Sequence, residues 1–453
     1  MKQSKHAFFY MVCQLAIPVA LQSMLQSSFS IIDQIMIGQL GSVSIAGVGL
    51  AGKFASIFSV VIAAIGAVAG IMIAQYLGQK NDFEVRRSFS INLVLGIGIA
   101  VIFTLSCVCL PEQIMSLYTK DADTRQAAAE YLQIIAGTFL PMAGATMLST
   151  FFRCEEKAKL PLYASIIAAL LNTGLNYIFI FGKFGSPVMG AKGAALATVI
   201  SQCANFLLMF WMIRKEELFR KKDSQNTEAK IPFHWDQYAA MLLPVLVCEF
   251  MWSLGENVYA AIYGHIGTQS SAAMTLANPI HGLMIGALCG LSQAASVIIG
   301  KKLGNKEYDD AYLSSKKLIV YGILGSLILS ALVIVTSSWY VQIYQMEEQV
   351  KVLTQQILFA YALIAPFKVL NMILGGGILR SGGKTKYVMV IDIVGTWVFG
   401  VPLGFLAAFV LNLSIPYVYF ILSLEECVRF AISVVVFRRK KWMNSLGTVS
   451  SQV

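Results

Sequence analysis

The segment LAIPVALQSMLQSSFSIIDQIMIGQLG, residues 15–41, decides the fold class and contains the first candidate functional residue. A helix of about 20 residues, rising about 1.5 Å per residue, crosses the hydrocarbon core of a bilayer. This segment is long enough to do so, and its one charged residue is a carboxylate, Asp33. A lone acid at membrane depth is costly and is kept mainly where it faces a protein interior or a water-filled path. We therefore predict a membrane-spanning helix in which Asp33 has a functional role.

The composition of the whole chain points to the same class of protein. Of 453 residues, 57% are hydrophobic and 13% are charged, and the mean hydropathy is +0.69. Soluble domains are about one quarter charged. Twelve apolar segments occur along the chain, at residues 12–38, 48–77, 90–110, 127–152, 160–182, 192–213, 237–263, 275–300, 317–338, 352–379, 387–410 and 415–437. The sequence predicts an all-α polytopic membrane protein with twelve transmembrane helices.

Lysine and arginine residues are concentrated at the N-terminus, in alternate loops and in the tail. The loop 214–236 and the tail residues 438–441 are rich in lysine and arginine, whereas the intervening loops contain few such residues. Cytoplasmic loops of membrane proteins carry this excess, so both termini and the loop 214–236 are predicted to be cytoplasmic. The net charge of +10 then reflects topology and attraction to anionic membrane lipids, and it does not indicate binding to nucleic acid.

The chain contains an internal repeat. One constant shift along the sequence, without a gap, superposes Pro18 on Pro244, Gly41 on Gly267, and the pair Leu77-Gly78 on Leu303-Gly304. The repeat predicts two pseudo-symmetric six-helix lobes, related by an axis along the membrane normal. We place the N-lobe at residues 1–213, a cytoplasmic linker at 214–236, the C-lobe at 237–440 and a cytoplasmic tail at 441–453.

Several kinds of chemistry are not indicated. The eight cysteines are isolated apart from Cys107-x-Cys109, and the four histidines are not at ligand spacing, so neither a disulfide framework nor a transition-metal site is predicted. The string SGGKT at 381–385 lacks the first glycine of a phosphate-binding loop. No nucleophile–base motif is present, so we expect no enzyme activity and no cofactor beyond a coupling ion.

Four segments resemble the MATE (multidrug and toxic compound extrusion) transporters. They are IIDQIMIGQLG (31–41), IMIAQYLGQK (71–80), LLNTGLNYIFIFGKFGSPVMGAKGAALATVIS (170–201) and ILRSGGKTKYVMVIDIVGTWVFGVPLG (378–404). The resemblance covers nearly the whole chain. It implies two six-helix lobes around a central cavity, and export of amphiphilic, often cationic molecules by antiport with Na⁺ or H⁺. It also implies a monomer in the plasma (inner) membrane of a bacterium.

The resemblance implies a cation-coupling site in the N-lobe. The family builds it from an acid in helix 1, two asparagine-type residues in helix 5 and a threonine in helix 6, which match Asp33, Asn172, Asn176 and Thr198. Asn172 and Asn176 lie four apart on one helical face, and Ala194 lies four residues before Thr198 on the same face. Carboxylate, amide and hydroxyl oxygens suit a hard cation such as Na⁺, the one metal ion that we expect. A desolvated carboxylate can also hold a proton, so both coupling ions remain open.

Candidate residues of the C-lobe are less sharply defined. Many relatives have a helix-7 glutamate eight residues after the proline, where this chain has Trp252. Glu249 and Glu256 share a helical stripe with Trp252, so an acid is still available on that face. These two acids and Asp392 are candidates for binding substrate or cation, and any of them could pair with a membrane lysine. Trp252 and Tyr259 are candidate cavity aromatics. Three further charged residues, Glu425, Glu426 and Arg429, are expected to satisfy one another near a helix end.

The leading function is therefore a secondary transporter that exports small, lipophilic, cationic molecules in exchange for Na⁺ or H⁺. The alternative is a flippase for lipid-linked oligosaccharides or other lipids. A flippase needs basic residues in its spans to meet a pyrophosphate. Only Lys53, Lys368 and Arg429 qualify, against at least five acids, so cationic cargo is favoured.

Overall fold

The computed structural model describes residues 5–215, 233–344 and 346–447. Contacts divide the chain into two compact units. The N-terminal unit comprises residues 25–73 and 82–234, and the C-terminal unit comprises residues 1–24, 74–81 and 235–453. The division between the halves falls at the predicted linker, most of which (216–232) lies outside the described residues. The first part of helix α1 and the last part of helix α2 are grouped with the second half, which the lobe prediction did not anticipate.

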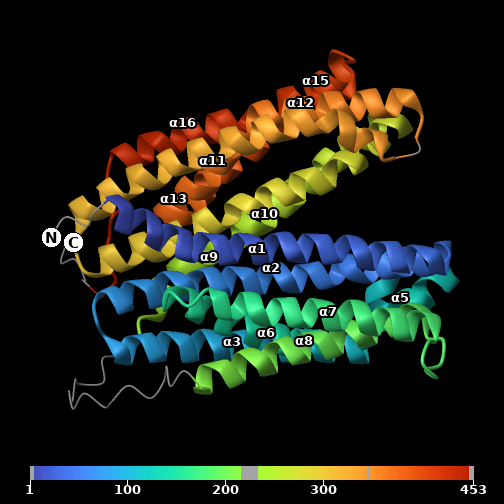
Figure 1. The fold of residues 1–453 in the computed structure, drawn as a ribbon, viewed down its shortest axis with the longest axis horizontal. Helices are drawn as coiled ribbons and strands as arrows, with labels where there is room; N and C mark the ends of the chain where they lie inside the picture. The colour runs from blue at the N-terminus through green and yellow to red at the C-terminus, as the bar shows by residue number, and fades with distance from the viewer. Residues whose placement is uncertain (1–4, 216–232, 345, 448–453) are drawn as a thin grey trace. The chain divides into compact units, whose positions relative to one another are not determined.

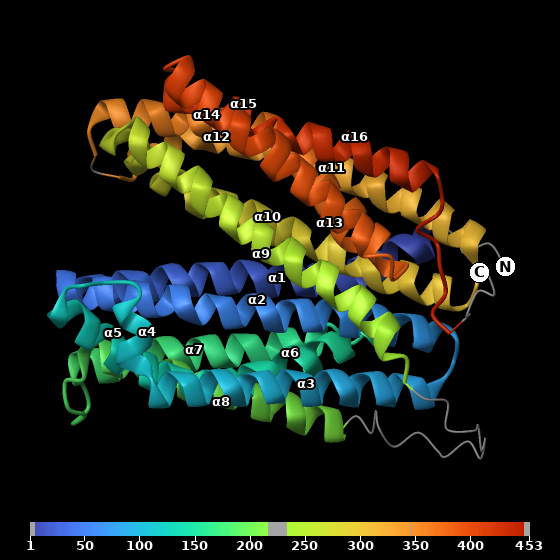
Figure 2. The same ribbon diagram turned by 180° about the vertical axis from the view of Figure 1, so that it is seen from behind.

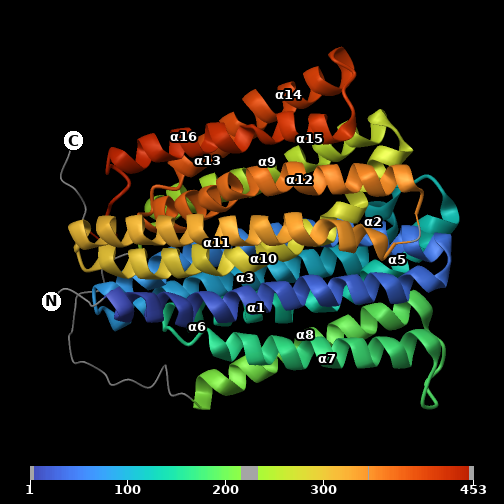
Figure 3. The same ribbon diagram turned by 45° about the horizontal axis from the view of Figure 1, so that its top comes forward.

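The N-terminal unit is a bundle of helices (Figure 1). Its helices are α1 (Lys5–Ile37, from residue 25), α2 (Ser42–Gly78, to residue 73), α3 (Asp82–Cys109), α4 (Pro111–Ser116), α5 (Ala122–Ile135), α6 (Phe139–Cys154), α7 (Lys159–Phe181) and α8 (Gly190–Lys215), with short 3₁₀ turns η1 (Gly38–Leu40) and η2 (Ala136–Thr138). Helices α7 and α8 lie side by side (Figure 3). Gly193 permits their close approach, because a Cβ there would lie 2.7 Å from the Phe179 carbonyl oxygen.

The C-terminal unit is also helical. Its helices are α9 (Trp235–Ile266), α10 (Thr268–Gly304), α11 (Tyr308–Gln342), α12 (Glu348–Asn371), α13 (Lys386–Ile393), α14 (Val401–Phe405), α15 (Ile415–Ser423) and α16 (Glu425–Arg438), with π-helical segments η3 (Met372–Leu379), η4 (Val394–Gly400) and η5 (Leu406–Val410). Helix α11 runs beside α12 (Figure 3), and α13 runs beside α9 (Figure 2). Single π turns in helices are frequent at functional sites, so η3 and η4 indicate that the C-terminal unit is a candidate location for such a site.

Eleven described helices are long and apolar enough to cross a membrane. They correspond to the first eleven predicted segments, with ends that differ by up to nine residues. The twelfth segment, residues 415–437, is helical but is interrupted at Leu424, where α15 ends and α16 begins. Neither piece alone is long enough to cross. The all-α polytopic prediction is confirmed, and its last span is divided in two.

The internal repeat is visible in the backbone. Helices α2 and α10 each contain 37 residues, and each follows a glycine with positive φ, Gly41 (φ +91°) and Gly267 (φ +149°). After each helix a lysine adopts the left-handed conformation, Lys80 (φ 56°) and Lys306 (φ 60°). Both pairs have the same separation in the sequence as Pro18 and Pro244. A non-glycine residue with positive φ is uncommon, so its occurrence at equivalent positions supports two copies of one folding pattern.

The chain after α16 packs against the C-terminal unit as far as it is described, to residue 447. Trp442 is completely buried, and its Nε1 donates a hydrogen bond to the Phe437 carbonyl oxygen (3.2 Å). The backbone nitrogen of Leu446 donates to Oε1 of the buried Gln75 (2.7 Å). Nε2 of Gln79 donates to the Leu446 carbonyl oxygen (2.6 Å). Residues 440–447, here called the C-terminal strap, thus hold the end of α2. The rest of the predicted tail lies outside the described residues.

Candidate functional site

The predicted N-lobe residues meet around Asp33 in the N-terminal unit. The Asn176 side-chain nitrogen donates to Oδ1 of Asp33 at 2.7 Å, and it lies 3.2 Å from Oδ1 of Asn172. Asn172 and Asn176 are both buried and lie one turn apart on α7. Two amides from one helix therefore face a carboxylate from another.

The Asn172 amide links this group to α8. In one orientation its nitrogen lies 3.3 Å from the hydroxyl oxygens of Thr198 and Ser201. With the amide nitrogen and oxygen exchanged, the nitrogen donates to both carboxylate oxygens of Asp33 at 3.0 and 3.1 Å, and the oxygen accepts from Ser201. The hydrogen-bond network decides between two such orientations. The exchanged orientation gives Asp33 a second amide donor, so we adopt it; the Asn172 atom 3.2 Å from the Asn176 nitrogen is then also a nitrogen, and the two amides do not bond to each other.

One oxygen of the cluster has no partner. Oδ1 of Asn176 is buried and accepts no hydrogen bond from the described residues. The Thr198 hydroxyl donates to the Ala194 carbonyl oxygen at 2.9 Å, so its lone pairs remain available on the side of Asn172. A buried acceptor without a donor costs about 1–3 kcal/mol. A cation ligated by the oxygens of Asp33, Asn176 and Thr198 would remove that cost, so these residues fit a hard monovalent cation.

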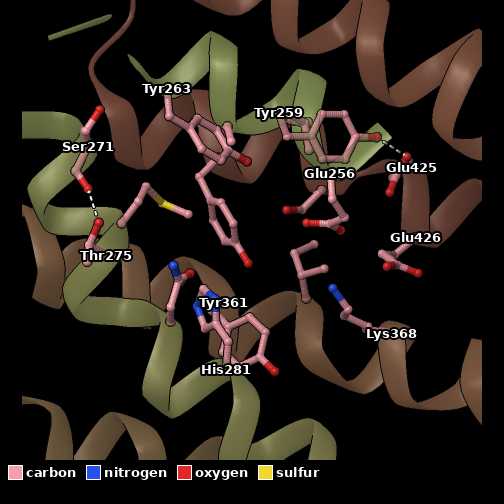
Figure 4. Close-up of a pocket in the computed structure, with 17 residues that line it drawn as sticks. Glu256, Tyr259, Tyr263, Ser271, Thr275, His281, Tyr361, Lys368, Glu425 and Glu426 are labelled. Atoms are coloured by element: carbon pink, nitrogen blue, oxygen red, sulfur yellow. Dashed lines mark hydrogen bonds between the residues drawn. The ribbon is translucent and has the colours of Figure 1, made fainter. Parts of the chain in front are cut away.

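A cavity of about 280 Å³ lies in the C-terminal unit (Figure 4). Glu256 and Tyr259 from α9 line it, together with Lys368 from α12 and the pair Glu425 and Glu426 from the start of α16. Glu425 and Glu426 begin α16 directly after Leu424, and both side chains line the cavity. Of the predicted C-lobe residues, Glu256 and Tyr259 are therefore at the cavity wall.

Aromatic rings form another wall of this cavity. The His281 ring lies 4.0 Å from the Tyr361 ring and 5.7 Å from the Tyr419 ring, measured between centroids. Tyr263 also lines the cavity and lies 6.3 Å from Tyr419. Such rings offer flat apolar faces and, through their electron-rich surfaces, attract cations. This wall therefore suits the aromatic or cationic part of a ligand.

Two of the cavity acids have hydrogen-bond partners. The Tyr259 hydroxyl donates to Oε2 of Glu425 at 2.5 Å, and Nη2 of Arg429 lies 3.5 Å from Oε1 of the same residue. The Asn371 amide nitrogen donates to Oε2 of Glu426 at 2.8 Å. The expected pairing of Arg429 within its helix is thus present for Glu425. Glu426 is bound instead by a different helix.

The other two predicted C-lobe acids belong to an adjoining chain of polar contacts. Glu249 forms an ion pair with Arg380 (2.9 Å), and Arg380 also donates to the Cys248 sulfur (3.1 Å). Cys248 in turn contacts Oδ2 of Asp392 at 2.8 Å, and Oδ1 of Asp392 lies 3.8 Å from Arg429. Neither Glu249 nor Asp392 lines the cavity. Their charges are compensated by arginines rather than by the membrane lysines considered from the sequence.

Trp252 occupies a different place from Tyr259. Its side chain is 44% exposed and is not part of the cavity wall. The three residues of the predicted stripe on α9 therefore have different surroundings. Glu249 is in an ion pair, Trp252 is exposed, and Glu256 lines the cavity.

Comparison with known proteins places the chain in a family. The MatE family model matches residues 18–178 and 244–406, which together make up most of the chain. The chain belongs to the MatE family. The two matched stretches begin at Pro18 and Pro244, the first pair of the internal repeat. The repeat is therefore the family's own two-fold pattern, and the predicted resemblance is confirmed.

Relatives and solved structures extend the MatE match over nearly the full length. The probable multidrug resistance protein NorM of Thermotoga maritima is 22% identical over 435 residues, covering 95% of this chain and 92% of that protein. The multidrug resistance protein MdtK of Yersinia enterocolitica is 25% identical over 414 residues, covering 86% of each. An outward-facing structure of a multidrug resistance MATE family transporter has 18% identity and a TM-score of 0.84, covering 95% of this chain and 96% of that chain.

Several residues of these sites in the MatE protein were not predicted from the sequence to be site residues. Ser201 lies one turn beyond Thr198 on α8, a spacing that could have revealed it. Lys368, His281 and the acids of α16 were visible as polar residues within apolar segments, which is the ordinary signal for intramembrane function. No pattern in the sequence predicted that the last helix is interrupted at Leu424.

Proposed function

We propose that this MatE protein is a multidrug efflux transporter that exports amphiphilic cations in exchange for Na⁺ or H⁺ bound at Asp33. The proposal rests mainly on one observation, the buried Asn176 Oδ1 without a donor among the described residues, beside the Asp33 carboxylate. The names of its relatives, which include multidrug resistance proteins NorM and MdtK, support the export of drugs.

Antiport follows if the coupling ion and the substrate stabilise different conformations. A ligand shifts a conformational equilibrium only by its differential affinity for the two states. The Asp33 cluster provides such a switch, because a bound cation would draw the Asn176 and Thr198 oxygens toward the carboxylate, whereas the free carboxylate bonds to amide nitrogens. Loss of the ion then allows the cluster to rearrange.

The charges of the C-terminal unit favour a cationic cargo over a lipid pyrophosphate. Arg380 and Arg429 are both held by carboxylates. Among the side chains that line the cavity, Lys368 is the one lysine or arginine, and it faces three glutamates. Recognition of a pyrophosphate relies on several free basic groups, so a lipid flippase is the weaker candidate.

The test is efflux of ethidium from proteoliposomes that contain the purified protein. A Na⁺ gradient and a pH gradient are imposed separately, and wild-type protein is compared with Asp33→Asn. We expect one gradient to drive export and the Asp33→Asn variant to lose that dependence. The matched control is Asp309→Asn, which removes an exposed acid at the first turn of α11.

Either of two results would overturn the proposal. Export that is unaffected in Asp33→Asn would remove Asp33 from the coupling site. No export under either gradient, together with flipping of a fluorescent lipid-linked sugar, would favour the flippase.

A further inference from the structure

The cavity of the C-terminal unit contains one acid and one base without a close polar partner. Glu256 forms no hydrogen bond or ion pair with any described residue, and no described carboxylate oxygen lies within 4.0 Å of Nζ of Lys368. The neighbouring acids Glu425 and Glu426 are bound by Tyr259 and Asn371. The cavity thus presents one acid, Glu256, and one base, Lys368, for which no hydrogen bond or ion pair is formed with the described residues (Figure 4), although Lys368 also acts electrostatically on Glu425.

These two groups come from different helices of the same unit. Glu256 is on α9 and Lys368 is on α12, whose residue Tyr361 lies two turns before the lysine. The aromatic wall of Tyr361, Tyr419 and His281 belongs to the same cavity. Nε2 of His281 is buried and has no hydrogen-bond partner among the described residues. A ligand that reaches this wall would therefore meet both an apolar face and an unused polar atom.

Glu256 is exposed and Lys368 is half-buried, so the cost of an unpaired charge falls mainly on Lys368, and the usual remedy is an opposite charge or a functional ligand. A ligand that carries a single positive charge would pair with Glu256 but would leave Lys368 without an ion-pair partner. An anionic ligand would have the reverse problem. A ligand with both charges can pair with both side chains. The cavity would discriminate against a singly charged analogue, because that analogue leaves one of the two side chains unpaired.

We propose that this cavity binds zwitterions, with the ligand's ammonium group at Glu256, its carboxylate at Lys368 and an aromatic ring between them against Tyr361 and His281. The inference rests on the proposed function, because it adds a preference among the amphiphilic cations that the exporter carries, for amines that also carry an anionic group. A volume of about 280 Å³ accommodates a ligand with one or two aromatic rings.

Three matched compounds test the inference by binding alone. They are 4-(aminomethyl)benzoic acid, which is a zwitterion, its methyl ester, which is a cation, and 4-methylbenzoic acid, which is an anion. Binding to the purified full-length protein is measured by saturation-transfer NMR and calorimetry, with the Asp33→Asn variant as the background so that the N-terminal site does not contribute. The longer 4′-(aminomethyl)biphenyl-4-carboxylic acid and its ester cover a wider separation of the two charges.

We expect the zwitterion to bind about tenfold more tightly than the ester or the anion, which corresponds to about 1.4 kcal/mol for one additional paired charge. Lys368→Met should abolish the preference over the ester. Glu256→Gln should weaken both amines. The control Lys384→Met removes the same charge from an exposed position outside the cavity and should change nothing.

A charge exchange keeps the test decisive if a single variant folds poorly. In the double variant Glu256→Lys with Lys368→Glu, the zwitterion can bind in the opposite direction, so its binding should return. Equal affinity of zwitterion and ester in both lengths, absence of binding by either, or a preference unchanged by Lys368→Met would each overturn the inference. Ethidium efflux is measured separately, so a transporter without this preference is distinguished from a protein that does not transport.

Discussion

Gly78 and Gly304 occupy equivalent positions in the two repeats, and each lies against the backbone of the other's helix. A Cβ on Gly78 would collide with the carbonyl oxygen of Lys301, and a Cβ on Gly304 would collide with that of Gln75. Gln75 and Lys301 are themselves equivalent, so the crossing of α2 and α10 is reciprocal. Small residues permit this contact between backbones. The two repeats are thus joined at a symmetric crossing that admits no side chain.

The crossing should not tolerate alanine. In Gly78→Ala or Gly304→Ala the new methyl group meets a carbonyl oxygen that is fixed in a helix, so we expect destabilisation of about 1–3 kcal/mol for overpacking. Thermal unfolding in detergent, followed by tryptophan fluorescence, measures the change. The control is Gly98→Ala in α3, where a Cβ would meet nothing within 4 Å. Equal melting temperatures for the three variants would contradict the proposed constraint.

The fold was predictable to the extent that it depends on hydropathy and repetition. Long apolar segments fix the helices, and paired turn residues such as Gly41 and Gly267 fix the repeat, because both signals are local in the sequence. The break at Leu424 was not predicted, since residues 415–437 contain no glycine and no proline near Leu424, although Glu425, Glu426 and Arg429 follow it directly. The grouping of residues 74–81 with the second half depends on contacts between distant segments, as with Gln75 and the C-terminal strap.

The same distinction applies to the sites. Asn172 and Asn176 were predicted from the resemblance to the MATE transporters, and their helical spacing agreed because it brings both to one face. The partner of Glu249 was not predictable, because Arg380 is 131 residues away and no local signal links the two. The tertiary structure determines which acid remains available to a ligand. Glu249 and Glu256 look alike in the sequence, and they differ only in the partners that the fold brings to them.

The ion pair between Glu249 and Arg380 should be energetically coupled. Its side chains are 30% and 14% exposed, so removal of one partner leaves the other incompletely solvated. Breaking a fully buried pair costs about 3–5 kcal/mol, and partial exposure reduces this figure. We expect Glu249→Gln and Arg380→Gln each to lower the thermal stability, and the double variant to lose less than the combined effect of the two. Additive losses in this double-mutant cycle would show that the residues act independently.

The C-terminal strap should contribute to stability through two residues. Trp442→Ala removes a fully buried ring, a change that costs about 3–5 kcal/mol in typical cores. Gln75→Leu removes the acceptor of the Leu446 nitrogen and the donor to the Ser381 carbonyl oxygen (2.6 Å). We expect both variants to melt earlier and to be cut more rapidly by protease after residue 438. Replacement of the exposed Trp339 by alanine is the control for loss of an indole ring. Unchanged proteolysis would mean that the strap adds little to the folded state.

The Asp33 cluster should reveal its coupling ion through thermal stability. A ligand that binds only the folded protein stabilises it by about 2.7 kcal/mol at about 100 times its dissociation constant. If Na⁺ is ligated by the carboxylate and by Oδ1 of Asn176, NaCl should raise the melting temperature of the wild type, whereas choline chloride at equal ionic strength should not. Asn176→Ala removes the unpaired oxygen and should abolish this difference. Asn257→Ala, which removes an exposed asparagine of α9 that bonds to its own helix, should retain it. A melting temperature that responds to pH but not to Na⁺, and that loses this response in Asp33→Asn, would instead assign the site to a proton.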